Sequence, residues 1–187
     1  MKKLNVIALC GSLRKDSYNR KLLQIAKKIA TDAGADVTEF DLRELNLPMY
    51  DGDVEAQGFP ESVQKLRRAA ESADVFLFAT PEYNASTSGA LKNAIDWLSR
   101  APKMLPGKVA TVFGATTGMS GTVRGQMHLR EILADTGLLL LPKPVVLIRF
   151  AGTAFTPDEQ FTDQKTHASL KELIEKTLKF SGAVHYT

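Results

Sequence analysis

The sequence has 187 residues, which at about 150 residues per domain predicts a single domain spanning residues 1–187. Its 44% hydrophobic and 24% charged content is that of a globular protein and excludes disordered, collagen-like and coiled-coil chains. The 24 Lys and Arg residues exceed the 21 Asp and Glu residues by only three, a surplus too small to indicate nucleic-acid binding.

A single cysteine, Cys10, excludes an internal disulfide and fits a reducing compartment. The strongly apolar runs reach about seven residues, far fewer than the roughly 20 that span a bilayer. We read no signal peptide at the N-terminus, and the histidines lack the spacing of metal ligands. The sequence therefore predicts a cytoplasmic protein with no membrane, nucleic-acid or metal partner.

Short apolar runs alternate with segments of helical periodicity along the chain. The predicted strands are residues 4–10, 37–40, 75–80, 109–113 and 138–141, the last one resuming at 145–148. The predicted helices are residues 19–33, 63–73, 91–98, 129–133 and 170–178. Residues 42–60 contain two prolines and two glycines and predict a loop. Pro142 and Pro144 lack an amide hydrogen, so they place the fifth strand at a sheet edge or break it.

Strands that alternate with amphipathic helices indicate a parallel sheet with helices on both faces. Five such strands predict a flavodoxin-like, three-layer α/β/α fold with strand order 2-1-3-4-5. In that order, the ligand crevice opens at the carboxyl ends of the first and third strands. The loops that follow these strands are therefore the first place to look for a site.

The loop after the first strand is polar and leads directly into a helix. It offers hydroxyls at Ser12 and Ser17, an amide at Asn19 and a guanidinium at Arg14. Free N–H groups at the start of a helix attract anions, so this set suits a phosphate monoester. The alternative is that Ser17 or Asn19 merely caps the helix. The loop matches neither the G-x-G-x-x-G fingerprint nor the P-loop pattern.

Two further loops face the same edge of the predicted sheet. Residues 81–89 begin with Pro81, and the N–H groups after it could meet a heterocycle while Tyr83 covers a ring face. The alternative is a turn followed by a Ser-capped helix. Residues 114–121 contain three glycines and three hydroxyl residues, so their backbone could approach a ligand closely, or they form an ordinary flexible loop.

The motifs in these loops resemble those of the NADPH-dependent FMN reductase family, which includes quinone, chromate and azo-dye reductases. The first motif is GSLRxxSxN from Gly11 to Asn19. The second is PEYNxS from Pro81 to Ser86, continued by GxLKNAIDWLSR from Gly89 to Arg100. The element order and chain length also match, so the resemblance covers about the whole chain. One departure is Ser88, where the family usually has proline.

The resemblance implies that the first loop binds the FMN phosphate, the second lies along the isoalloxazine and the third closes the site. The residues implied in cofactor binding are Ser12, Leu13, Arg14, Ser17, Tyr18, Asn19, Pro81, Glu82, Tyr83, Asn84, Thr116, Thr117 and Gly118. Ser88 makes the start of the following helix less rigid than proline would, and this could alter flavin affinity or access to the ring.

With FMN bound, the chemistry belongs to the flavin. NADPH or NADH would deliver hydride, and two electrons would pass to a second substrate in a ping-pong cycle. No side chain need act as a catalytic residue. Quinones, chromate, azo compounds and free flavin all remain open as acceptors. Arg14 and Lys15 would favour the 2′-phosphate of NADPH, but Arg14 is also expected to contact FMN, so the nucleotide preference stays open.

Two large apolar side chains fit their own helices poorly. Trp97 lies roughly 110° from the apolar stripe of its helix, and Met127 lies nearly opposite the stripe of its own helix. We expect them to contact a second copy in a homodimer or homotetramer, with the flavin near the interface, as the resemblance also implies. The alternative for Trp97 is a flank position packed by a loop.

Two other functions share the predicted fold. A flavodoxin-type electron carrier would have no pyridine-nucleotide activity, but such carriers are usually acidic, whereas the isoelectric point here is about 8.9. A phosphoryl-accepting signalling module needs an aspartate at the end of the third strand. This chain has Ala79, Thr80 and Pro81 there.

Overall fold

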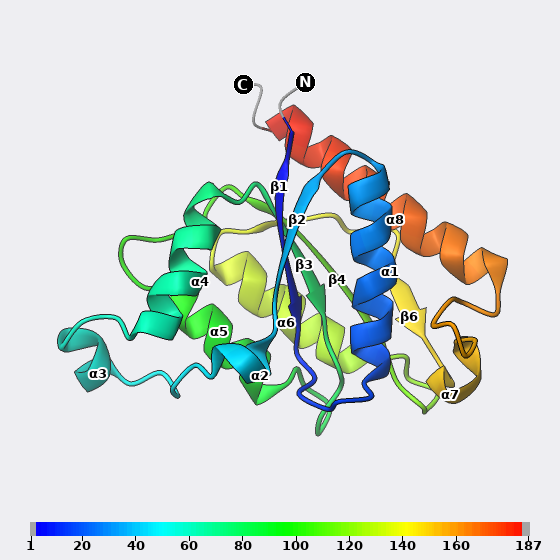
Figure 1. Cartoon of the computed structure of the whole chain (residues 1–187), viewed down its shortest axis with the longest axis horizontal. Coiled ribbons are helices and arrows are strands. Elements are labelled where there is room, and N and C mark those ends of the chain that lie inside the picture. The colour runs from blue at the N-terminus through cyan, green and yellow to red at the C-terminus, as the bar shows by residue number, and fades with distance from the viewer. Residues whose placement is uncertain (1–2, 185–187) are drawn as a thin grey trace.

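The computed structural model describes residues 3–184 and shows a parallel sheet between two layers of helices (Figure 1). Its strands are β1 (Asn5–Cys10), β2 (Asp36–Phe40), β3 (Val75–Ala79), β4 (Val109–Ala115), β5 (Leu139–Leu140) and β6 (Val146–Ile148). Its helices are α1 (Tyr18–Asp32), α2 (Leu42–Leu45), α3 (Gly52–Ala56), α4 (Glu61–Ser72), α5 (Gly89–Leu98), α6 (Val123–Asp135), α7 (Ala151–Ala154) and α8 (Gln164–Val184). Within these described residues, no helix combines the length and apolar character needed to cross a membrane.

The sheet has the order β2-β1-β3-β4-β5, and each neighbouring pair is parallel. This confirms the predicted flavodoxin-like order. A further strand, β6, pairs with the second half of β4, whereas β5 pairs with the first half. Pro142 and Pro144 lie between β5 and β6, and neither can donate a ladder hydrogen bond, so the edge is built from two short pieces.

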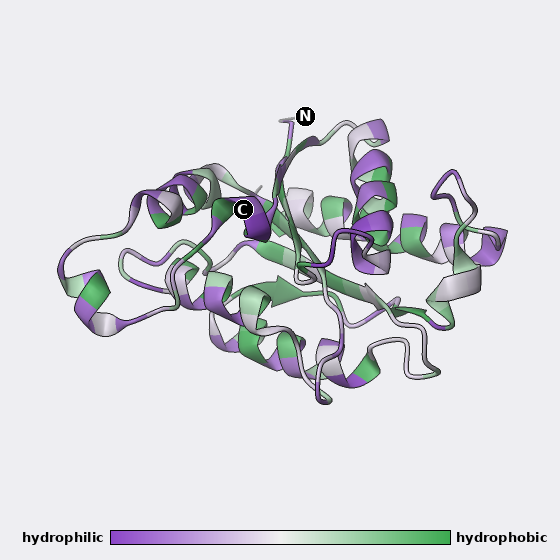
Figure 2. Cartoon of the chain, turned by 60° about the horizontal axis from the view of Figure 1, so that its bottom comes forward, coloured by the Kyte–Doolittle hydropathy of each residue, from purple (hydrophilic) through white to green (hydrophobic). Residues whose placement is uncertain are grey.

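Each face of the sheet carries its own hydrophobic core. α1 and α8 pack on the face that includes Val6 and Ala8, and α4, α5 and α6 pack on the face that includes Ile7 and Phe76. Figure 2 shows the hydrophobic residues concentrated along the central strands and the hydrophilic residues on the outer sides of the helices. Burial on both faces explains why β1 and β3 are continuous apolar runs rather than alternating ones.

The predicted loop over residues 42–60 is wrong in part, because it contains α2 and α3. Each of these short helices begins at an aspartate whose carboxylate accepts a backbone hydrogen bond. Asp41 accepts from the amide of Arg43 at 2.9 Å, and Asp51 accepts from the amide of Asp53 at 2.8 Å. Helices of four or five residues are too short to show an apolar period, so pattern analysis missed them.

The prediction that Trp97 lies on a partner surface is wrong. Its side chain is fully buried within the chain, and its indole N–H donates to the carbonyl of Pro48 at 2.8 Å. The rings of Tyr50 and Phe59 pack edge-on against it, with centroid distances of 5.0 and 6.2 Å. The loop packing offered as the alternative is what the structure shows. Met127 on α6, in contrast, is 64% exposed.

Candidate functional site

The three polar loops leave the sheet side by side at its carboxyl edge, at the bottom of Figure 1. Cys10, the last residue of β1, pairs with Ala79 at the end of β3, and Ala79 pairs with Phe113 of β4. The loops that begin at Gly11, Thr80 and Thr116 therefore start from neighbouring points, as the strand order predicts.

The loop after β1 ends in the first turn of α1. Ser17 is the N-cap, and its hydroxyl oxygen accepts from the amides of Asn19 at 3.2 Å and Arg20 at 3.4 Å. The first turn of α1 has no acidic residue, so its positive end is not neutralised from within the helix. Ser12 is buried, and Arg14 is exposed. Both the capping and the anion-binding interpretations of Ser17 are compatible with this geometry.

Asn19 uses its side chain to tie α1 to β4. Its amide nitrogen donates to the carbonyl of Ala115 at 2.9 Å, and its amide oxygen accepts from the Ala115 amide at 2.8 Å. The side chain is buried and engaged at both ends, so it fixes the distance between the first and third loops. Tyr18, the neighbouring predicted site residue, stacks on Phe155 with ring centroids 5.9 Å apart.

The loop after β3 forms a tight hairpin. Tyr83 and Ser86 exchange backbone hydrogen bonds of 2.9 and 3.0 Å, and Asn84 and Ala85 between them have positive φ angles of 49° and 61°. The Tyr83 amide is therefore used inside the hairpin. The Tyr83 side chain is 46% exposed, so its ring is available to cover a flat ligand.

Glu82 reaches from this hairpin to the start of α6. Its carboxylate oxygen Oε2 accepts from the amides of Arg124 at 2.9 Å and Gly125 at 3.2 Å. His128, one turn further along α6, lies 3.2 Å from the Ser86 hydroxyl through Nδ1. The sequence carries no signal for these contacts, because the partners are 42 residues apart.

The end of β4, from which the third loop leaves, lies close to the start of the second loop. An added Cβ at Gly114 would lie 2.3 Å from the Thr80 carbonyl oxygen, so only glycine fits at this point. Thr116 is fixed by backbone hydrogen bonds to Ile148 and Ala151, whereas Thr117 and Gly118 are exposed. The structure thus brings the three predicted loops to one edge and holds them through contacts with α1, β4, β6, α6 and α7.

A hollow of about 330 Å³ opens between the first two loops. It is lined by Gly11, Leu13, Arg14, Arg43, Tyr83, Ser88, Gly89 and Ala90. Arg43 belongs to α2 and was missed because that segment was predicted to be a loop. Ser88 caps α5, with its hydroxyl accepting from the Leu91 amide at 3.2 Å, so the residue that departs from the family pattern has a structural role here.

Cys10 lies beneath the first loop and is buried. Its thiol lies 3.7 Å from the Ser12 carbonyl oxygen. Burial raises the pKa of the Cys10 thiol to about 11. The thiol is therefore protonated at neutral pH and is not a nucleophile, in line with the structural role expected of a small apolar side chain.

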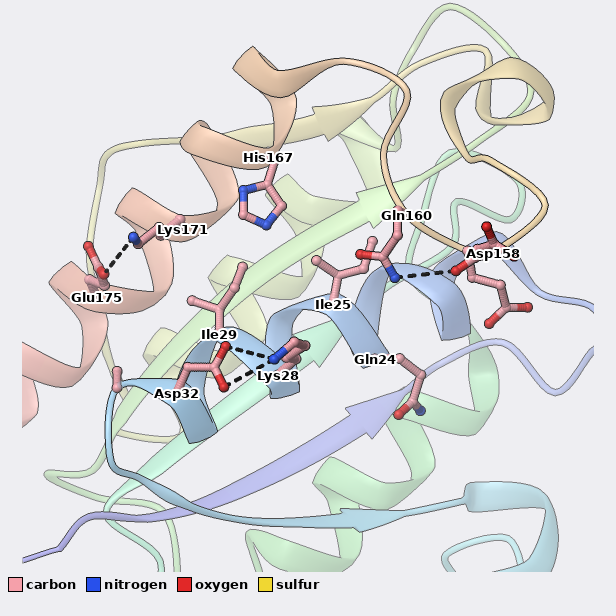
Figure 3. A pocket seen from close by; sticks show the side chains of 12 residues that line it. Gln24, Ile25, Lys28, Ile29, Asp32, Asp158, Gln160, His167, Lys171 and Glu175 are labelled. Carbon is pink, nitrogen blue, oxygen red and sulfur yellow. Dashed lines mark hydrogen bonds and ion pairs between the residues drawn. The ribbon is translucent and has the colours of Figure 1, made fainter.

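A second hollow, of about 430 Å³, lies between α1 and α8, away from these loops. Figure 3 shows its charged side chains paired along each wall, Lys28 with Asp32 and Lys171 with Glu175. None of the predicted site residues lines it. The carboxyl edge is therefore the better candidate for the site.

Comparison with known proteins identifies the family of the chain. The profile of the family described as NADPH-dependent FMN reductase matches residues 4–153. An NAD(P)H-dependent FMN reductase of Pseudomonas aeruginosa is 41% identical over 177 residues, 94% of this chain and 92% of that protein. An NAD(P)H:quinone oxidoreductase of Solanum tuberosum is 40% identical, covering 96% and 95%.

Among solved structures, a flavoenzyme NAD(P)H:acceptor oxidoreductase from Paracoccus denitrificans superposes with a TM-score of 0.86. The two chains are 34% identical, and the match covers 96% of this chain and 98% of the other. Fold, loop motifs and relatives thus agree, and the chain belongs to the NADPH-dependent FMN reductase family of oxidoreductases.

Proposed function

We propose that the protein binds FMN at the carboxyl edge of its sheet and uses NAD(P)H to reduce quinones. The observation that carries the proposal is the meeting of two features at this edge. One is the start of α1, with hydroxyls and no acidic residue. The other is the Tyr83 hairpin, with an exposed ring. A phosphate and a flat heterocycle are the two ligand groups that such features suit. The names of the similar proteins support the same activity.

The residues present fit FMN, and each loop would have a distinct role. Ser12, Arg14 and Ser17 would hold the phosphate together with the first amides of α1, and Tyr18 would flank it. Pro81 to Asn84 would lie along the isoalloxazine, with Thr116 to Gly118 closing the site. Asn19 and Glu82 would act by position, because their side chains already bond Ala115 and the start of α6.

FMN supplies the redox chemistry when bound, so that NAD(P)H, a proton and a quinone give NAD(P)⁺ and a hydroquinone. The protein side chains would hold the cofactor and leave one face open, with no acid or base among them. Nucleotide and acceptor would use that face in turn, which is the basis for a ping-pong cycle. Chromate, azo compounds and free flavin would need only the same open face.

An anaerobic absorption spectrum, taken before and after NADPH addition, tests the cofactor and the donor together. We expect a yellow protein that bleaches. A yellow protein that stays oxidised would favour the electron-carrier alternative. A colourless protein that takes up no FMN would show that both loops are misinterpreted. Double-reciprocal plots at several quinone concentrations should then be parallel, and intersecting lines would contradict the ping-pong cycle.

We also propose that the protein forms a homodimer or homotetramer, in which α6 contributes Met127. The support is that Met127 is a large apolar side chain left exposed on a helix. Analytical ultracentrifugation at micromolar concentration should show an oligomer, and Met127→Glu should weaken it. Met49→Glu is the control, because Met49 is equally apolar and exposed but lies outside α6. A monomeric wild-type protein would refute the proposal.

We place the protein in the cytoplasm. The support is Cys10, a free and buried thiol of the kind that persists in reducing compartments. Detection of the protein in an oxidising compartment after cell fractionation would contradict this location.

A further inference from the structure

Two arginines line the hollow between the first two loops. Arg14 comes from the loop after β1 and Arg43 comes from α2, and both line the same 330 Å³ space. Within residues 3–184, neither guanidinium makes a hydrogen bond or an ion pair. Arg20 and Arg67, in contrast, bond to a carboxylate and to carbonyls, respectively. The hollow is therefore a positively charged one.

The position of Arg43 is fixed by its backbone rather than by its side chain. Asp41 caps α2 by accepting from the Arg43 amide at 2.9 Å. The same carboxylate is paired with Arg20 through a 2.6 Å contact, and the Arg43 charge acts on it through space without forming an ion pair. Asp41 thus anchors α2 while leaving the Arg43 side chain to contribute to the hollow.

The remaining wall indicates what kind of anion fits. Leu13 and Tyr83 are 40% and 46% exposed, so an aromatic or apolar group can lie beside the two cations. The Arg43 guanidinium suits a phosphate monoester, because its planar set of N–H donors can bind two phosphate oxygens at once. The hollow is lined by α2 and α5, which pack on the opposite face of the sheet from α1. The start of α1, where the FMN phosphate is expected, lies on the other face, so the Arg43 side of the hollow is left for a second phosphate.

NADPH differs from NADH by one phosphate monoester, at the 2′ position of its adenosine. We propose that Arg43 binds this 2′-phosphate and makes the protein select NADPH over NADH. The inference rests on the proposed function, since it assigns the nucleotide specificity of that same site. A charge-assisted hydrogen bond to phosphate accounts for roughly a tenfold to hundredfold preference.

The kinetic test compares Arg43→Gln with the wild type for both nucleotides. We expect the ratio of kcat/KM for NADPH over NADH to fall about tenfold or more, mainly through the KM for NADPH. Arg68→Gln is the matched control, because it removes the same charge from an exposed arginine that does not line this hollow. The control should keep the wild-type ratio.

A binding test needs no turnover. Calorimetry with adenosine 2′,5′-bisphosphate and adenosine 5′-monophosphate, on protein supplied with FMN, should show tighter binding of the bisphosphate. Arg43→Gln should remove that difference, and Arg68→Gln should keep it.

Three results would overturn the inference: a wild type that uses both nucleotides equally, an Arg43→Gln variant that keeps the NADPH preference, or a variant that loses FMN affinity instead. The last result would assign Arg43 to the flavin phosphate. In the first two cases flavin-dependent turnover would persist, so the proposed function would stand. If neither nucleotide reduces bound FMN, the proposed function fails, and calorimetry still decides whether Arg43 recognises the 2′-phosphate.

Discussion

Two regions of the molecule differ in whether their polar groups are hydrogen-bonded within the chain. The first is the Trp97 cover, the segment of residues 48–59 that packs over Trp97. Here the Pro48 carbonyl accepts from both Trp97 and Asn93, at 2.8 and 2.9 Å, and the Asn93 oxygen accepts from the Tyr50 amide. The second region is the crevice at the carboxyl edge, where the guanidinium groups of Arg14 and Arg43 make no hydrogen bond or ion pair with the described residues.

The contrast is sharpest between arginines. Arg67 lies under the cover and donates to the carbonyls of Trp97, Arg100 and Pro102, with its guanidinium 4.1 Å from the centroid of the Phe59 ring. Burial lowers the pKa of Arg67, yet these carbonyls satisfy its donors. A cation surrounded by internal acceptors stabilises the fold. Arg14 and Arg43, in contrast, are exposed on an open hollow and remain accessible from solvent.

Of the substitutions considered, Trp97→Ala should destabilise the Trp97 cover most. Trp97 is fully buried, so we expect a loss of about 3–5 kcal/mol in the free energy of unfolding, measured by urea denaturation. Met49→Ala, at an exposed position of the same cover, should change the free energy by less than about 0.5 kcal/mol. A Trp97→Ala protein as stable as the Met49→Ala protein would show that the cover is not a core.

Gly114→Ala tests how closely the end of β4 approaches Thr80, at the start of the second loop. The new Cβ would overlap the Thr122 hydroxyl and the Thr80 carbonyl, at 2.1 and 2.3 Å, and the carbonyl cannot rotate away. We expect a cost of about 1–3 kcal/mol and weaker FMN binding by fluorescence titration. Gly182→Ala is the control, because no atom lies within 4 Å of its added Cβ. Equal stability of the two variants would contradict the close approach.

Ser17→Ala separates helix capping from ligand binding. Losing the cap of α1 should cost about 1 kcal/mol of stability, and losing a hydroxyl from the phosphate site should weaken FMN binding about tenfold. Asp51→Ala removes the cap of α3 and should leave FMN binding unchanged. If Ser17→Ala lowers stability alone, Ser17 is only a cap.

The smallest expected change in stability comes from replacing Asp41, the N-cap residue of α2. The hydrogen bond from Arg20 holds the pKa of the Asp41 carboxyl below its ordinary value. The stability from this pair is fully present above the pKa of an unfolded aspartate, about 3.9, and is lost as pH falls through the lower folded pKa. In the wild type, the free energy of unfolding should decrease as the pH is lowered below about 4. In Asp41→Asn, this decrease should be smaller, as measured by urea denaturation at a series of pH values. An unchanged slope would argue against the pair.

Local patterns predicted the sheet order and its binding edge, because buried parallel strands are short apolar runs that need no long-range information. Local patterns could not predict contacts between segments that are far apart in the sequence. Asn19 resembles an ordinary helix cap in sequence, yet it bonds Ala115, 96 residues away. Trp97 seemed misplaced because a helical projection shows angles within one helix and not the loop that covers it. Arg43 was not predicted as a site residue, because it lies in α2, a helix too short to show an apolar periodicity.

The contact from Glu82 to α6 also decides where an anion can settle at this edge. The helices α1, α5 and α6 follow the three loops, and the start of each presents a partial positive charge. Neutral hydroxyls of Ser17 and Ser88 cap α1 and α5, whereas the amides of α6 are met by a carboxylate. One of the three ends is thus occupied by a charge of the chain itself. An incoming phosphate would therefore be attracted to the starts of α1 and α5 rather than to the start of α6.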